Sequence, residues 1–350
     1  MCKELDKSLL RIDCRRHVTE LEIKHFAGPI TGRGTTAPGD ILFKRYQEKF
    51  DTIRDSINYQ NLNTFKWPEE GSFIYEKAKE VAELVQKMIE EDTFTRGDYK
   101  DLAVLVYVYL TGETDINGKR FRVSLPHGVS HARFMQRGLY YITLQLLGTQ
   151  ADYMNYSEVE RREVELLAEF SALFYTPMFL QSLLAAEAPT LDLKNIQDLR
   201  RMVRISEEEY EAEQNEKNRA KLEALRGALG NVYHHPDYLT QTNIVMALAG
   251  DTMSDEDKTV IARCIWDTLE KAGGIVDNFP FNPDNMKKMD ICSIWPEDEQ
   301  RPDLCRFIGH NSLNLFYHLG MADKVSLSWM TKEPKEWKLD VDYEKFREFV

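Results

Sequence analysis

The sequence has few of the features that mark secreted, membrane-spanning or disulfide-bonded proteins. Its 350 residues include five cysteines, which form no C-x-x-C pair and no metal-binding spacing, so they are typical of reduced thiols in the cytoplasm. No stretch approaches the roughly 18 consecutive apolar residues of a membrane span. Residues 1–17 mix charges where a signal peptide would have an apolar core. We therefore expect a cytoplasmic protein with no signal peptide, no transmembrane segment and no membrane partner.

Basic residues are also in deficit. The chain has 58 Asp and Glu against 45 Lys and Arg, which gives a formal net charge of −13. Binding to a nucleic-acid backbone requires a basic surface, so no nucleic acid is expected among the partners. Hydrophobic residues make up 43% of the chain, which is enough to bury a core and excludes an intrinsically disordered protein.

Apolar residues recur at helical spacing through most of the chain, which favours an all-α fold with one large multi-helix domain. The run LAVLVYVYL suits either a strand or a buried helix, and its helical neighbours favour the helix. Asn117-Gly118 is typical of a hairpin turn. The first predicted helix begins at residue 41. The others cover 74–91, 102–110, 158–184 with an interruption at Pro177, and 191–203, and further helices are expected near 239–248, 255–271 and 304–319.

Glycine and proline divide the chain into three regions. Residues 25–39 are rich in Gly, Thr and Pro and predict a loop or an extended arm, without the GxxxxGK[ST] pattern of a P-loop. Residues 273–303 predict a second long loop. We therefore expect an N-terminal arm over 1–40, a helical core domain over 41–272, and a C-terminal loop and helical extension over 273–350.

One charged segment also carries a helix-start signal. Residues 206–226 are densely charged and predict a solvated helix face. Their opening, Ser206-x-x-Glu209, resembles a capping box.

The candidate site centres on His127 and His131, in an H-G-x-x-H sequence directly after Pro126. Proline is common at a helix start, and helical spacing of four residues places both imidazoles on one face, about 6 Å apart. There they can share a phosphate, hold a metal ion or divide acid and base roles, and the first turn of a helix favours an anion. Gly128 lets a ligand approach the backbone. The alternative is a pair of structural histidines.

Cations surround this motif, and no acidic residue occurs between Lys119 and Gln150. We expect Arg122, Arg133 and Arg137 to contact a substrate phosphate through charge-assisted hydrogen bonds. Gly128 stands where zinc proteases of the H-E-x-x-H type have their catalytic Glu, and the chain contains no His-Asp dipeptide, so no metal and no other cofactor is expected.

The sequence Pro126-His127-Gly-x-x-His131 within a helical domain resembles the phosphodiesterase domain of SidE-type bacterial effectors. The resemblance implies metal-independent cleavage of the pyrophosphate of ADP-ribosylated ubiquitin. In that family one His is a nucleophile that carries a phosphoribosyl intermediate, a Glu orients it, and a later His is the general acid. The resemblance therefore implies His127 as nucleophile and His131 as its partner. Glu187 is our candidate for the orienting acid, because it is an isolated acid in an apolar run, and the alternative is a helix end that faces water. Gly250 stands where the later His is expected. His234 or His235 is the candidate replacement, with His235 preferred, and the alternative is that both form a polar turn before Pro236.

Three functions follow as hypotheses. The first is a phosphodiesterase acting on a nucleotide or an ADP-ribose-linked, possibly ubiquitin-linked, protein, and the resemblance then implies secretion into a host cell and a host protein partner. The second is a catalytically degenerate domain that binds a nucleotide or a protein partner without turnover, in line with Gly250. The third is an acidic helical adaptor that uses the 206–226 helix and an exposed Trp329 and Trp337.

Overall fold

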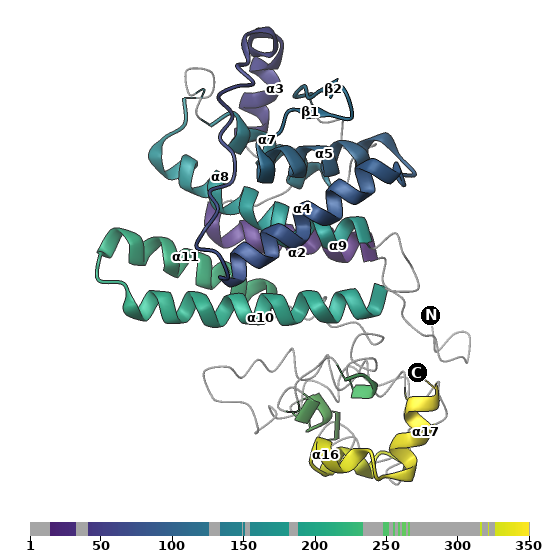
Figure 1. Cartoon of the computed structure of the whole chain (residues 1–350). Coiled ribbons are helices and arrows are strands. Elements are labelled where there is room, and N and C mark those ends of the chain that lie inside the picture. Colours follow the sequence, from purple (N-terminus) through teal and green to yellow (C-terminus); the bar gives the residue numbers. More distant parts are fainter. Residues whose placement is uncertain are drawn as a thin grey trace, which may run out of the picture. The chain divides into compact units, whose positions relative to one another are not determined.

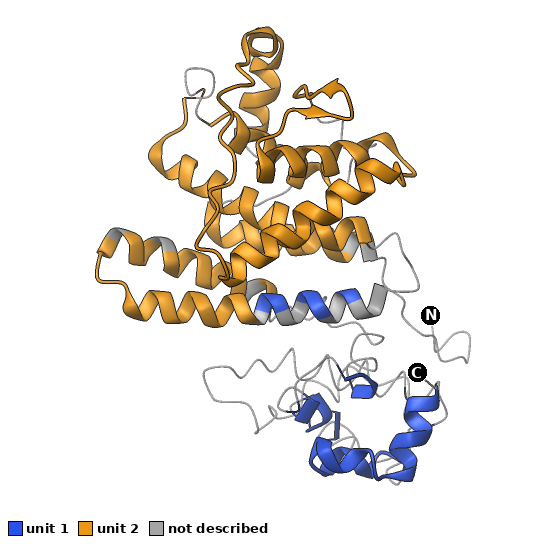
Figure 2. Cartoon of the chain, in the orientation of Figure 1, with its two compact units in different colours: residues 1–14, 186–200, 233–350 blue, residues 15–185, 201–232 orange. Residues whose placement is uncertain are grey.

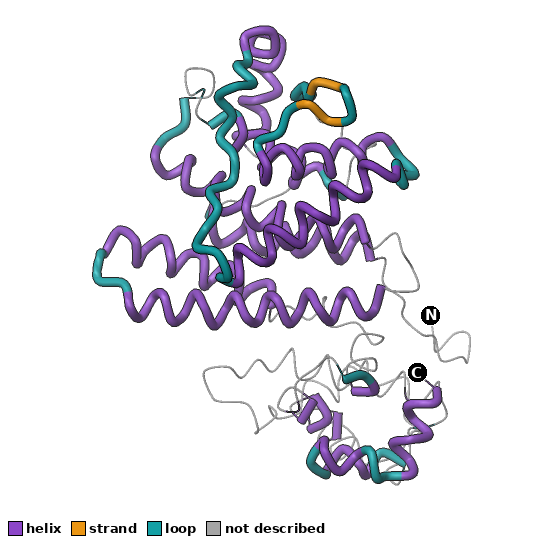
Figure 3. Tube along the Cα trace, viewed as in Figure 1, coloured by secondary structure: helices purple, strands orange, loops and turns teal. Residues whose placement is uncertain are grey.

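The computed structural model describes residues 15–32, 41–125, 134–148, 150, 155–181, 188–233, 248–251, 321 and 326–349, with single residues between 255 and 316. The chain forms two compact units, which are treated separately (Figure 2). The larger unit contains residues 15–185 and 201–232, and the smaller unit contains residues 1–14, 186–200 and 233–350. The structure is 73% helical, with two short strands in one small sheet among the described residues, which confirms the all-α prediction (Figure 3).

The elements of the larger unit are mainly helices (Figure 1). None of the described helices combines the length and the apolar character needed to cross a membrane. The elements are α2 (Arg15–Thr31), α3 (Ile41–Ile53), η1 (Arg54–Ser56), α4 (Phe73–Glu91), α5 (Gly97–Thr111), β1 (Asp115–Ile116), β2 (Lys119–Arg120), α7 (Gln136–Leu146), α8 (Glu158–Phe170), the π-helical turn η2 (Ser171–Tyr175), α9 (Thr176–Gln181), α10 (Ala188–Ala212, shared with the smaller unit) and α11 (Glu216–Tyr233).

Helices α4 and α5 of the larger unit pack against each other. Helix α4 begins after Ser72, whose hydroxyl accepts a hydrogen bond from the Tyr75 amide at 3.3 Å, as an N-cap does. It buries Ala78, Val81, Val85 and Ile89 on one face, as its sequence period predicts. Helix α5 is buried around most of its circumference, so the run LAVLVYVYL is a core helix and not a strand, as predicted.

The predicted hairpin is present. Strands β1 and β2 pair antiparallel, with Asp115 opposite Arg120 and Ile116 opposite Lys119. Asn117 and Gly118 have φ values of 52° and 72°, the left-handed conformation that a type I′ turn requires at both central positions.

Helix α2 corrects the prediction of a loop over 25–39, because residues 25–31 are helical. The Phe26 ring stacks on Phe170 of α8 at 3.9 Å, and Ile23 is fully buried. Pro29 lies in the last turn of α2 on the exposed side, where the carbonyl that loses its amide partner can bond water. The packing of α2 thus outweighs the helix-breaking tendency of Pro29. The helix ends at Gly32, which has a φ of 59°. Residues 33–39 lie outside the described part of the chain.

The structure corrects two further predictions, at Pro177 and at Ser206. The interruption at Pro177 is a π-helical turn and not a break, since Pro177 has no amide to donate and the chain widens over 171–175. The Thr176 amide and hydroxyl both donate to the Ser171 carbonyl, the latter at 2.7 Å. Ser206 caps no helix: it lies inside α10 and donates to the Val203 carbonyl at 2.7 Å.

The described elements of the smaller unit are η5 (Ser328–Thr331), α16 (Pro334–Trp337) and α17 (Val341–Phe349). They correct the prediction of exposed tryptophans, because the side chains of Trp329 and Trp337 are 0% and 1% exposed. Trp329 contacts the rings of Trp337, Tyr343 and Phe346 at centroid distances of 5.0, 5.0 and 5.3 Å. Both tryptophans are therefore core residues, so they do not provide a docking surface for an adaptor.

Replacing Trp337 by Ala should lower the free energy of unfolding of the smaller unit by about 3–5 kcal/mol, because it leaves a cavity within this aromatic cluster. Leu339→Ala is the matched control, since Leu339 is 87% exposed and the change should cost less than about 0.5 kcal/mol. Urea denaturation followed by tryptophan fluorescence measures both values. Equal midpoints for the two variants would contradict the buried cluster.

Candidate functional site

Most of the residues proposed from the sequence for catalysis and substrate binding lie outside the described part of the chain. The structure describes Arg122 and Arg137, which flank the H-G-x-x-H segment on either side. The arrangement of the others stays a prediction; they are His127, Gly128, His131, Arg133, Glu187 and His235.

The five residues that lead into this segment, 121–125, form an extended stretch that we call the strap. Phe121 and Val123 are 8% and 7% exposed, whereas Arg122 and Ser124 are exposed. This alternation is that of an extended chain with one face on the core. The strap begins with a hydrogen bond from the Phe121 amide to the Thr114 carbonyl at 2.7 Å, which continues the hairpin.

Two tyrosines fix the strap to the core. The Val123 amide donates to the Tyr59 hydroxyl at 3.1 Å, and the Tyr46 hydroxyl donates to the Ser124 carbonyl at 3.4 Å. The Arg122 guanidinium lies over the Tyr59 ring at 4.8 Å, a cation–π contact that orients this predicted phosphate ligand. Burial raises the pKa of Tyr46, so its hydroxyl keeps its proton and remains a donor.

A third tyrosine holds the other side of the segment. The Tyr175 hydroxyl, from the π-helical turn, donates to the carbonyl of Phe134. Tyr175 is fully buried, and this burial raises its pKa well above the usual value. A Cβ on Gly138 of α7 would lie 2.9 Å from Cε1 of the Tyr175 ring, so only glycine leaves room for this ring. The backbone just before and just after residues 126–133 is therefore held by tyrosine hydroxyls.

Arg137 is an unusual residue for its position. It lies in the first turn of α7 and is 6% exposed, and within the described residues its Nη1 atom has no hydrogen-bond partner. The neighbouring Gln136 Oε1 is also unpartnered there. A buried cation at a helix N-terminus is unfavourable for two reasons: burial removes its charge from water, and the helix dipole is positive at that end. An anion bound near Arg137 would compensate for both costs.

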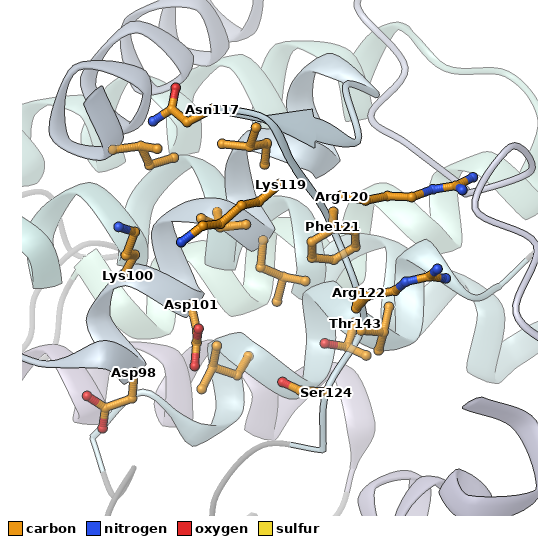
Figure 4. A pocket seen from close by; sticks show the side chains of 16 residues that line it. Asp98, Lys100, Asp101, Asn117, Lys119, Arg120, Phe121, Arg122, Ser124 and Thr143 are labelled. Carbon is orange, nitrogen blue, oxygen red and sulfur yellow. The ribbon is translucent and has the colours of Figure 1, made fainter. Parts of the chain in front are cut away.

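A cavity of about 290 Å³ lies between α5, the hairpin, the strap and α7 (Figure 4). Its walls combine apolar side chains with polar groups that no short motif marks in the sequence, because they come from separate elements. The only sequence signal is the basic run Lys119-Arg-Phe-Arg122. The polar groups missed are Lys100 and Asp101 of α5, Asn117 of the turn, Ser124 of the strap and Thr143 of α7.

The charges around the cavity are partly neutralised. Asp98 accepts two hydrogen bonds from the guanidinium of Arg96, one of them at 2.9 Å, and Lys100 donates to Asp92 at 2.6 Å. Figure 4 shows Lys119 reaching across the cavity toward Lys100, while Arg120 and Arg122 point away from it. Among the described residues, no three His, Cys, Asp or Glu side chains lie close enough together to hold a metal ion.

Comparison with known proteins found no matching family model, no matching curated protein and no matching solved structure.

The hydrogen bond between Val123 and Tyr59 can be tested by removing one hydroxyl. Tyr59→Phe should lower the free energy of unfolding by about 1–3 kcal/mol, because a buried amide loses this acceptor. Tyr107→Phe is the control, since the Tyr107 hydroxyl donates a hydrogen bond to the exposed Glu113. This hydrogen bond raises the pKa of Tyr107 to about 12. Urea denaturation by circular dichroism gives the stabilities, and hydrogen exchange of the Val123 amide locates the change. Unaltered exchange at Val123 would show that the bond does not hold the strap.

Proposed function

We propose that this protein is a metal-independent phosphodiesterase that acts on a nucleotide or an ADP-ribose-linked protein through His127. The supporting observation is that tyrosine hydroxyls hold the backbone on both sides of residues 126–133, within a stretch that has cations and no acidic residue. Such anchoring is what a preorganised site needs, because reacting groups must be held close to their productive geometry.

The chemistry follows from the two histidines. A ring nitrogen of His127 attacks the phosphorus atom, and the bond between phosphorus and the leaving oxygen breaks as His131 gives that oxygen its proton. Water then attacks the phosphorus, His131 takes the proton of the water, and the bond to His127 breaks. Glu187 orients His127, and His235 is the alternative acid. A well-placed general acid contributes roughly 10²- to 10⁴-fold to the rate.

The arginines supply charge in this proposal. Arg122 and Arg133 neutralise the phosphate oxygens, and the buried Arg137 is a preorganised positive charge that costs no reorganisation when the substrate binds. A phosphate group also offers the acceptor that the Arg137 Nη1 atom lacks within the described residues.

A second candidate is binding without turnover. Gly250 stands where the resembling family has its later His, and here its carbonyl accepts a hydrogen bond from Lys258 in the smaller unit. The position thus carries a structural contact and no ionisable side chain. A protein of this kind would retain the pocket and bind a nucleotide or a partner protein unchanged.

The two histidines can be separated by the leaving group of the substrate. His127→Ala should abolish cleavage of both ADP-ribosylated ubiquitin and bis(p-nitrophenyl) phosphate, because the nucleophile is lost. His131→Ala should abolish cleavage of the first substrate but still release about one equivalent of p-nitrophenolate from the second, since p-nitrophenolate leaves without a proton. Further turnover should then be slow, because hydrolysis of the His127 intermediate lacks its base. Product release measured by chromatography and by absorbance gives both rates.

Unchanged turnover in His127→Ala would exclude this mechanism. No turnover by the wild-type protein, together with a rise in melting temperature on addition of ADP-ribose, would support binding without chemistry. The absence of both turnover and a thermal shift would contradict both candidates and leave the adaptor hypothesis, which now depends on the charged helices without the tryptophans.

A further inference from the structure

The cavity beside the strap has one apolar wall that is little exposed to water, which we call the floor. Leu105, Phe121 and Leu139 are 6%, 8% and 6% exposed and line it from three different elements. Transfer of apolar surface from water onto such a floor is favourable by about 25 cal/mol per Å². A volume of about 290 Å³ is at the lower limit of small-molecule sites, so the floor suits one ring or a short chain.

Positive charge lies at the edge of this floor. Lys119 is exposed and, within the described residues, forms no ion pair, and Figure 4 shows it directed across the cavity toward Lys100. Lys100 pairs with Asp92, whose side chain is 68% exposed, so this pair is only a weak competitor for an incoming anion. The cavity thus has two lysines among its lining residues beside the apolar floor.

The acids of the cavity do not make it a cation site. The Asp98 carboxylate already accepts two hydrogen bonds from Arg96 and has a side chain 8% exposed. Asp101 lies within the cavity below Lys119 in Figure 4, where its charge disfavours a second anionic group deeper in the site. The electrostatics therefore favour a single anionic group at the edge, with an uncharged body inside.

We propose that this cavity binds a small amphiphilic anion, with an apolar ring or short chain against Leu105, Phe121 and Leu139 and one phosphate or carboxylate at Lys119. The binding site is independent of His127 and of any cleavage, so it goes beyond the proposed function. The hydroxyls of Ser124 and Thr143, which also line the cavity, can orient a polar substituent of the ligand.

Isothermal titration of the full chain tests this site with four probes: phenyl phosphate, phenylacetate, benzyl alcohol and inorganic phosphate. At least one of the two ring-bearing anions should bind about tenfold more tightly than benzyl alcohol and than inorganic phosphate. The preference between phenyl phosphate and phenylacetate identifies the anionic group. Lys119→Gln should reduce the affinity for the preferred anion by about tenfold, down to that of benzyl alcohol.

Two variants make the test specific to the cavity. Lys87→Gln is the matched control, because this lysine of α4 is 72% exposed, does not line the cavity and should leave all affinities unchanged. Val104→Trp should abolish binding of all ring-bearing probes, since the half-buried Val104 lines the cavity and the indole fills it. Circular dichroism confirms that this variant is folded, and Lys119→Gln alters only an exposed hairpin position.

Several results would overturn the proposal. They are equal affinity for benzyl alcohol and the two ring-bearing anions, equal affinity for inorganic phosphate and the preferred ring-bearing anion, or full binding to folded Val104→Trp. Binding that is retained in His127→Ala supports the site even if the protein cleaves nothing. Conversely, cleavage through His127 without binding of any ring-bearing probe would overturn this inference and leave the proposed function intact.

Discussion

Hydrogen bonds between buried tyrosine hydroxyls and the backbone are the constraint on which the geometry around the H-G-x-x-H segment depends. A phenol buried without a partner is costly, and Tyr46, Tyr59 and Tyr175 each form a hydrogen bond with a backbone group. Burial raises the pKa of Tyr46 and of Tyr175, which keeps both as proton donors throughout the physiological range. The strap and Phe134 are thereby fixed from the core and not from the surface.

The position of Tyr175 follows from a single proline and a single glycine. Pro177 cannot donate an amide hydrogen bond, and the chain meets this by widening into the π-helical turn that contains Tyr175. Gly138 leaves space for the ring, since a Cβ there would approach it to 2.9 Å. Neither residue resembles a functional residue in the sequence, yet together they permit the contact that holds Phe134.

Sequence reasoning succeeded where a local signal decides the structure. The apolar period of α4 and the Asn117-Gly118 turn each depend on residues within a few positions of each other. It was wrong where tertiary packing decides: stacking of Phe26 on Phe170 extends α2 through Pro29, and aromatic packing buries Trp329. The cavity was not predictable, because Lys100, Lys119 and Thr143 come together only through the packing of α5, the hairpin and α7.

The overall charge of −13 is a poor guide to the charge at the cavity beside the strap. Charges more than about 8 Å apart are largely screened at physiological salt, so acids farther away than this have little effect on a ligand at Lys119. Two of the acids that do lie nearby are engaged, since Asp98 binds Arg96 and Asp92 binds Lys100, and Asp101 is the third acid at the cavity. A ligand entering the cavity therefore meets the local excess of positive charge on the hairpin, and an acidic protein can still select an anion there.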